Sequence, residues 1–351
     1  MPDITRDSHY VPQATLRRWS NDGVYVYAYR ILVSHDSVPE WVKQPIKSMT
    51  RQADLYTTLE GDEESDKFEK RFTHLYEEPG QAAIEKVLAG QRMMPREWNH
   101  IAMFVALQQM RTPLFFLEFV KRMNQQIPEI LATVVKDYEG RLEVASALKV
   151  SAQTSDPNYL GDTLRVSIQP SAGPERATGI TAQVSSSRAA WLATISGMLV
   201  RLEKVICQHR WRAIEPAGDA DWPLTDHPVL TLNYYRPGLY DFGAGWGRKG
   251  SEFILPVSPR VAVCTQVGSN NHGPRTMTAH QTQGVQRFMA ERALRWIIVR
   301  PGAGDWVPST RPRTVNADAF AAEQEAWSRW HSGHIESEAE FRAGQKRPSC
   351  D

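Results

Sequence analysis

One apolar run near the middle of the chain constrains the fold more than any other feature. Residues 101–107 read Ile-Ala-Met-Phe-Val-Ala-Leu, so every face of a helix through them is apolar. A helix that is hydrophobic on all sides is buried in a protein core. Gln108, Gln109 and Arg111 follow immediately. The sequence therefore predicts a buried central helix with polar residues directly after its apolar run.

Arg111 is the most informative of these polar residues. A buried arginine without a partner costs several kcal/mol, so it is rarely found inside a protein unpaired. We expect Arg111 to be at least half buried and to meet a carboxylate, Asp226 first and Glu85 second. The same residue could hold a substrate phosphate, or it could be one half of a buried ion pair that joins two parts of the fold.

The first half of the chain combines a few strands with several helices. Residues 24–29 are β-branched and aromatic and predict a strand, and residues 53–57 predict a second one. A helix is expected over 81–88 and another over 96–123, where Pro113 removes a backbone hydrogen bond and should kink or divide it. Residues 154–179 are rich in Ser, Thr, Pro, Asp and Gly, and we interpret them as a linker with one short strand at 164–168.

The second half changes its pattern. A helix is expected over 185–209, where apolar residues recur at helical spacing. Four short strands separated by Gly and Pro follow, at 211–214, 229–233, 252–256 and 261–267. A closing helix is expected over 281–298, and two more in the polar tail, over 317–330 and 336–343.

These elements predict a helix-rich α+β fold. It would have a small N-terminal strand unit, a helical middle and a C-terminal mixed region of short antiparallel strands and helices. The expected parts are residues 1–175, residues 176–305, integrated with the first part into one fold, and a polar tail over 306–351.

Charge and cysteine content narrow the classes of function. The chain carries 41 Lys and Arg against 40 Asp and Glu, a net charge of +1. This balance excludes a nonspecific electrostatic grip on nucleic acid spread over the whole surface, although a local basic groove is compatible with it. The three cysteines have no metal-ligand spacing, so neither a disulfide framework nor a structural zinc site is implied. With no signal peptide and no long apolar run, the expected location is the cytoplasm, away from membranes.

The N-terminus has an unusual number of side chains that can bind anions or transfer protons. His9, Gln13 and Arg17 lie around one proline and on successive turns of a short helix, so they could form an anion site. His9 itself has three interpretations: a general acid or base, a phosphate contact together with Arg17, or a hydrogen bond to a backbone carbonyl that holds the terminus in place.

Asp226 lies where a loop enters a predicted strand, a common position for catalytic carboxylates. It could be a metal ligand, a general base or a substrate anchor. The alternative is a turn in which its side chain caps backbone N–H groups before Pro228.

Known catalytic motifs are mostly missing. The chain contains no GxxxxGK[ST], no GxSxG and no HExxH. Asp7 to Pro12 has the strand pattern of a ββα-metal nuclease, but His35 lacks the companion residues of that site. Asp226 and Glu252 have the spacing of a restriction-type nuclease, but position 254 is Ile rather than Lys.

Five segments together resemble a family of unknown function found mainly in bacteria. Members of that family open with His-Tyr-Val-Pro-Gln and then Leu-Arg and an aromatic residue. The matching segments are His9-Tyr10-Val11-Pro12-Gln13 with Leu16-Arg17-Arg18-Trp19, Asp54-Leu55-Tyr56-Thr57, Gln108 with Arg111-Thr112-Pro113, Thr225-Asp226-His227-Pro228-Val229, and Leu255-Pro256-Val257-Ser258-Pro259. The resemblance covers about residues 8 to 300 and supplies candidate positions but no reaction.

The motifs suggest a function that the resemblance does not. We expect His9, Gln13, Arg17, Gln108, Arg111 and Asp226 to share one cleft. The leading hypothesis is a hydrolase acting on a phosphate-containing substrate, either nucleic acid or a nucleotide. Arg17 and Arg111 would hold phosphate with Gln13 and Gln108, Asp226 would bind a divalent metal such as Mg²⁺ or Mn²⁺ or activate water, and His9 would shuttle a proton. The alternative is a non-catalytic ligand-binding sensor or protein-interaction scaffold in which the motif residues are structural.

Overall fold

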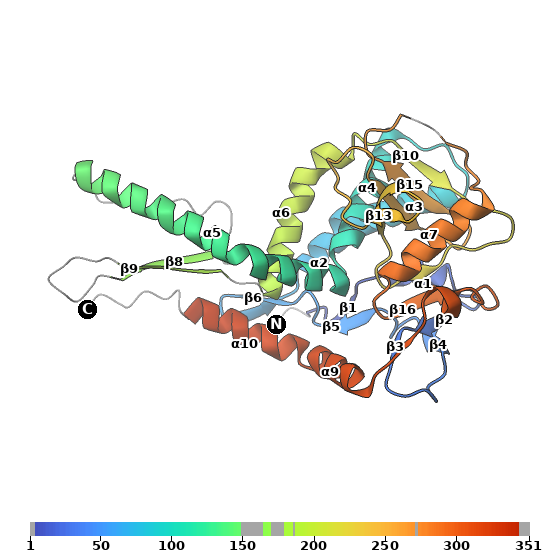
Figure 1. Ribbon diagram of the computed structural model, residues 1–351, viewed down its shortest axis with the longest axis horizontal. Coiled ribbons are helices and arrows are strands. Elements are labelled where there is room, and N and C mark those ends of the chain that lie inside the picture. The colour runs from blue at the N-terminus through green and yellow to red at the C-terminus, as the bar shows by residue number, and fades with distance from the viewer. Residues whose placement is uncertain (1–3, 149–163, 170–178, 185–186, 271–272, 344–351) are drawn as a thin grey trace. The chain divides into compact units, whose positions relative to one another are not determined.

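The computed structural model describes residues 4–148, 164–169, 179–184, 187–270 and 273–343. It is a mixed α+β fold, as the sequence predicts, with N-terminal strands, a helical middle and a C-terminal antiparallel sheet with helices (Figure 1). The chain folds into two compact units. The first comprises residues 1–57, 65–115 and 195–331, and the second comprises 58–64, 116–194 and 332–351.

Two antiparallel sheets form the framework of the first unit. The five-stranded sheet has the order β10 (Trp211–Ile214), β15 (Ala262–Gln266), β14 (Glu252–Pro256), β12 (Leu230–Arg236) and β13 (Leu239–Asp241). The four-stranded sheet has the order β11 (Leu224–Thr225), β16 (Trp296–Val299), β2 (Tyr25–Arg30) and β4 (Trp41–Pro45).

The remaining strands form short pairs. These are β1 (Asp7–His9) with β5 (Arg51–Ala53), β3 (Leu32–Val33) with β17 (Thr314–Val315), β6 (Thr58–Glu60) with β7 (Glu63–Ser65), and β8 (Leu164–Gln169) with β9 (Gly179–Val184). The strand expected at 164–168 is thus confirmed. Residues 154–163 and 170–178 of the expected linker lie outside the described residues.

The helices are distributed along most of the sequence. They are α1 (Gln13–Arg17), α2 (Lys67–Phe72), a π-helical turn (Thr73–Glu77), α3 (Glu78–Leu88), α4 (Pro95–Met110), α5 (Pro113–Leu148), α6 (Arg188–Ile206), α7 (Ala279–Arg292), α8 (Val307–Thr310), α9 (Ala317–Ser328) and α10 (Trp330–Ala343). No helix in the described part of the chain is long and apolar enough to cross a bilayer.

The central helix is buried, as its apolar run requires. Every residue from Ile101 to Leu107 is at most 7% exposed. The helix expected over 96–123 is divided at Arg111 and Thr112, and α5 begins at Pro113. Because proline is favoured at the first position of a helix and removes a backbone hydrogen bond further in, the chain ends one helix and starts another there.

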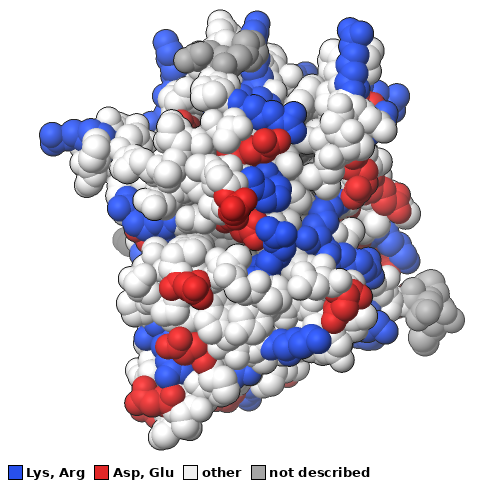
Figure 2. All heavy atoms as spheres, turned by 90° about the vertical axis from the view of Figure 1, so that its right-hand side faces the viewer, with Lys and Arg blue, Asp and Glu red and all other residues white. Residues whose placement is uncertain are grey.

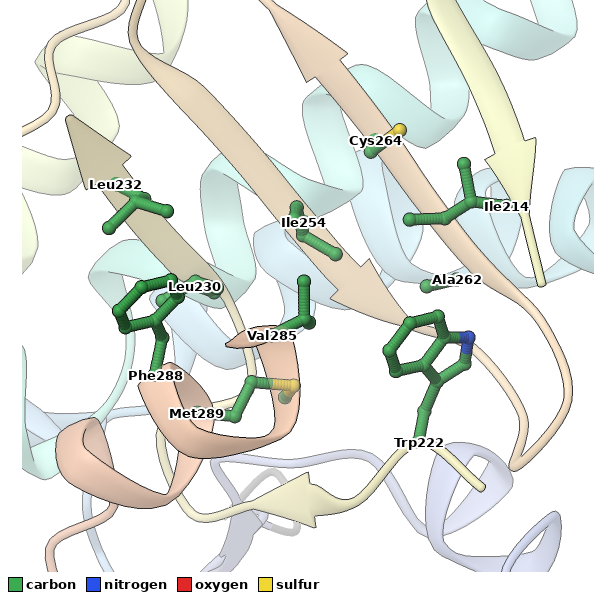
Figure 3. Close-up of a cluster of buried hydrophobic side chains, with 10 residues drawn as sticks. All are labelled: Ile214, Trp222, Leu230, Leu232, Ile254, Ala262, Cys264, Val285, Phe288 and Met289. Carbon is green, nitrogen blue, oxygen red and sulfur yellow. The ribbon is translucent and has the colours of Figure 1, made fainter. Parts of the chain in front are cut away.

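Helix α7 packs on both sheets. On one side Val285, Phe288 and Met289 cover the five-stranded sheet, together with Trp222 from the loop before β11 (Figure 3). On the other side Ala290 and Ala293 join a second apolar cluster on the four-stranded sheet. Two apolar clusters of the first unit therefore meet at this one helix.

Two predicted elements need correction. The helix expected over 281–298 ends at Arg292, and residues 296–299 are the buried strand β16 between β2 and β11. The strand expected over 53–57 is displaced, because β5 ends at Ala53 and Asp54 takes a left-handed backbone conformation with φ 52°. This turn starts the loop that leads to β6.

Candidate functional site

Three of the family-like segments meet in a buried polar network around Arg111, which is 1% exposed. Its guanidinium donates to the carboxylate of Glu77 and to the backbone carbonyl of His9, and its Nε donates to the Tyr56 hydroxyl at 3.0 Å. The Tyr56 hydroxyl donates in turn to the Arg111 carbonyl at 2.9 Å. The side chain thus ties the N-terminal strand to the end of α4.

The expected burial of Arg111 is confirmed, but both expected partners are wrong. The carboxylate is Glu77, from the π-helical turn, while Glu85 instead accepts from Arg18 at 2.6 Å. Burial by itself would lower the pKa of Arg111, but the charge of Glu77 together with the effects of Tyr56 and Glu69 outweighs burial and raises that pKa above the usual value. The guanidinium is therefore charged and held by protein acceptors.

His9 contributes mainly its backbone to this network. Its ring Nε2 lies 3.1 Å from the carbonyl oxygen of Lys47. Burial lowers the pKa of the ring, which opposes protonation, although hydrogen bonds to backbone groups partly raise it. This contact matches the interpretation in which the histidine holds the terminus in place.

Gln13 and Arg17 lie on the exposed face of α1, where Arg17 Nη2 donates to Gln13 Oε1 at 3.2 Å. Gln108 is the opposite case, with 1% exposure and no hydrogen-bond partner for either amide atom among the described residues. None of these residues accepts a hydrogen bond from the Arg111 side chain in the described part of the chain.

Asp226 is 3% exposed and binds backbone rather than side chains. Its two carboxylate oxygens accept from the N–H groups of Leu294 at 3.0 Å and Arg295 at 2.7 Å. These groups follow the end of α7, so the aspartate fixes the turn that connects α7 to β16. Burial raises the pKa of Asp226 to about 6, even though these hydrogen bonds favour the charged form.

Two neighbours connect Asp226 to the other segments. Thr112, next to Arg111, hydrogen-bonds through its hydroxyl to His227 Nδ1 at 2.7 Å. Tyr10 is 1% exposed, and its pKa is raised first by burial and next by the charge of Asp226. Arg111, Thr112, His227 and Asp226 therefore belong to one connected interior framework that extends to the backbone of Arg295.

A cavity lies at the far end of this framework, beside Arg295. Its volume is about 370 Å³, and its wall includes β2, β3, β4, β16 and α9. Two arginines line it, Arg30 and Arg295, with one carboxylate, Glu323, and the aromatic rings of Trp296 and Phe320. The lining thus carries one more positive than negative charge.

Arg295 is the most unusual residue of this lining. Its Nε donates to Glu323 at 2.6 Å, and its guanidinium carbon lies 4.2 Å from the centre of the Trp327 ring. Its Nη2 is buried and has no acceptor among the described residues. A buried donor without an acceptor costs about 1–3 kcal/mol, which makes this nitrogen a candidate for a ligand contact.

Sequence reasoning missed Arg295, Arg30 and Glu323. None lies in one of the five matching segments, and the helix expected over 281–298 would have placed Arg295 in its last turn. The available signal was an arginine between Leu294 and Trp296, directly before the β-branched run Ile297-Ile298-Val299. No group of three or more His, Cys, Asp or Glu residues with the geometry of a metal site occurs in the described ranges.

Comparison with known proteins identifies the family. Residues 8–303 match the model of a protein family of unknown function, DUF4238, so the chain belongs to this family. Neither the curated proteins nor the solved structures that were compared include a match. The family assignment confirms the resemblance seen in the five sequence segments.

Proposed function

We propose that this protein binds a small phosphate-containing ligand in the cavity beside Arg295, without hydrolysing it. The observation that carries the proposal is the buried, acceptor-free Nη2 of Arg295, a residue that lines a cavity of about 370 Å³. Ligand pockets in proteins are commonly about 300–1,000 Å³, so a molecule of nucleotide size or smaller fits this range. Arginine forms paired hydrogen bonds with phosphate oxygens more readily than any other side chain.

The engagement of the motif residues favours binding over hydrolysis. Hydrolysis would need Arg111 to hold phosphate and Asp226 to bind a metal or activate water. Arg111 donates to Glu77, Tyr56 and a backbone carbonyl, and Asp226 accepts two backbone N–H groups. In this proposal the motif residues act indirectly, because Asp226 fixes the backbone of Arg295.

Surface charge favours a small ligand over a polymer. On the face shown in Figure 2, basic side chains are interspersed with acidic ones. Proteins that bind nucleic acid usually present a basic stripe or patch along the path of the backbone. The nearly balanced charge of the chain, +1, agrees with the same choice.

Isothermal titration calorimetry with inorganic phosphate and adenosine monophosphate tests the proposal. Arg295→Lys keeps the charge beside Glu323 but removes the paired donors, and we expect it to weaken phosphate binding at least tenfold. Arg287→Lys is the matched control, because Arg287 pairs with Glu291 on α7 and does not line the cavity. This control should bind like the wild type.

Two outcomes would overturn the proposal. One is that the wild type binds neither inorganic phosphate nor adenosine monophosphate, or that Arg295→Lys binds them as tightly as the wild type. The other is release of inorganic phosphate from adenosine monophosphate that is lost in His9→Ala and Asp226→Asn. That second result would restore the hydrolase hypothesis.

A further inference from the structure

The carboxylate that pairs with Arg295 comes from outside the family domain. Family residues end at 303, whereas Glu323 and Trp327 lie on α9, at 317–328. The segment that leads to α9 is anchored by β17, which pairs in parallel with β3, and α9 itself packs beside β3. The cavity is therefore closed partly by residues of the family domain and partly by the tail.

Glu323 accepts from only one of the two donors, Nε and Nη2, on the guanidinium edge that it contacts. The Nε and Nη2 donors of an arginine point in parallel, so one planar anion can accept from both. Here Glu323 accepts from Nε at 2.6 Å, while Nη2 is left without an acceptor among the described residues. The pair is largely shielded from water, with side-chain exposures of 16% for Arg295 and 23% for Glu323.

We propose that Glu323 is an internal competitor that determines which anions enter the cavity, an inference that rests on the proposed function. A dianionic phosphate or phosphomonoester displaces the carboxylate and accepts from both Nε and Nη2. A monocarboxylate brings no more charge than Glu323 and lacks the advantage of being tethered, so it does not displace it. Helix α9 thereby selects doubly charged phosphate over singly charged acids.

The lining supports this selection in a second way. Arg30 is the other cation of the cavity, and Glu323 is its sole carboxylate among the described lining residues. When a dianion displaces Glu323 from Arg295, two arginines face two ligand charges. Each ligand charge then has an arginine as its partner, whereas a monoanion that displaced Glu323 would leave one arginine of the lining without an anion.

Calorimetry on the full chain at pH 7.5, with inorganic phosphate and acetate as probes, tests the proposal. Glu323→Gln should bind phosphate at least tenfold more tightly than the wild type and should gain measurable binding of acetate. The matched control is Glu325→Gln, on the same helix, because Glu325 pairs with Arg329 at the surface. It should match the wild type for both probes.

The results separate this inference from the proposed function. If the wild type binds phosphate through Arg295 but Glu323→Gln binds it no more tightly and still rejects acetate, the competitor role is overturned and the binding function stands. If no variant binds phosphate, including Glu323→Gln, both are overturned. Far-ultraviolet circular dichroism on each variant confirms that the comparison is made between folded proteins.

Discussion

The two arginines at the ends of the interior framework differ in how fully their donors are used. Arg111 meets a carboxylate, a hydroxyl and a backbone carbonyl, all from the protein. Arg295 meets one carboxylate and an aromatic ring, and one of its nitrogens has no acceptor in the described structure. The contrast indicates that an arginine inside a family motif can be structural, while an arginine outside every motif can be the one available to a ligand.

Replacement of Arg111 is expected to have the largest effect. Arg111→Ala leaves Glu77 without its buried partner and should lower the free energy of unfolding by about 3–5 kcal/mol, the usual cost of breaking a buried pair. Urea denaturation measures this change. Arg51→Ala, which removes an exposed pair with Asp7, should cost less than about 1 kcal/mol. Equal losses in the two variants would remove the distinction between a structural and an available arginine.

Asp226 connects the two regions, so its replacement should affect both stability and binding. In Asp226→Asn one of the two N–H groups at the end of α7 loses its acceptor, at a cost of about 1–3 kcal/mol. Because the turn then holds Arg295 less firmly, phosphate binding should weaken as well, measured by calorimetry at a temperature where the variant is folded. A variant that loses stability but binds phosphate like the wild type would show that Asp226 does not position Arg295.

Acid should lower the free energy of unfolding through His227, which hydrogen-bonds to Thr112 next to Arg111. Burial lowers the pKa of this histidine from 6.5 to about 3. The unfolded chain therefore takes up a proton below pH 6.5 while the folded protein does not, and this stability is lost as the pH falls from 6.5 toward 3. At pH 5 the loss is about 2 kcal/mol, from 1.36 kcal/mol for each pKa unit.

His227→Gln tests this pH dependence by removing the titrating group. Its free energy of unfolding, measured by urea denaturation at pH 7.5 and 5, should fall by about 2 kcal/mol less than that of the wild type over this interval. Identical losses in the two proteins would mean that His227 is protonated in the folded state.

Much of the fold could be predicted because its signals are local. The apolar run over 101–107 predicts that this part of the central helix is buried, and Pro113 marks the division between α4 and α5. The closing helix was overextended because β16 is only four residues long, Trp296–Val299, and follows α7 almost directly. Its identity depends on pairing with β2, which no local pattern encodes.

The candidate site was harder to predict for a related reason. The sequence indicates that Arg111 needs a carboxylate, but Glu77 lies in a π-helical turn within a charged stretch that shows no sign of burial. Arg295 and Glu323 are ordinary charged residues whose contact depends on the tail returning to β3. Residue type predicts the need for a partner, whereas the fold decides which partner supplies it.

The position of α7 has a consequence for how the first unit comes apart. One helix supplies side chains to the apolar layers of both sheets, so separating it from either one exposes hydrophobic surface on the other. The two sheets should accordingly melt together, giving a single calorimetric peak for this unit in place of two. A substitution such as Phe288→Ala would then shift that peak as a whole. If α7 separates from the five-stranded sheet, its contacts with the four-stranded sheet are lost as well.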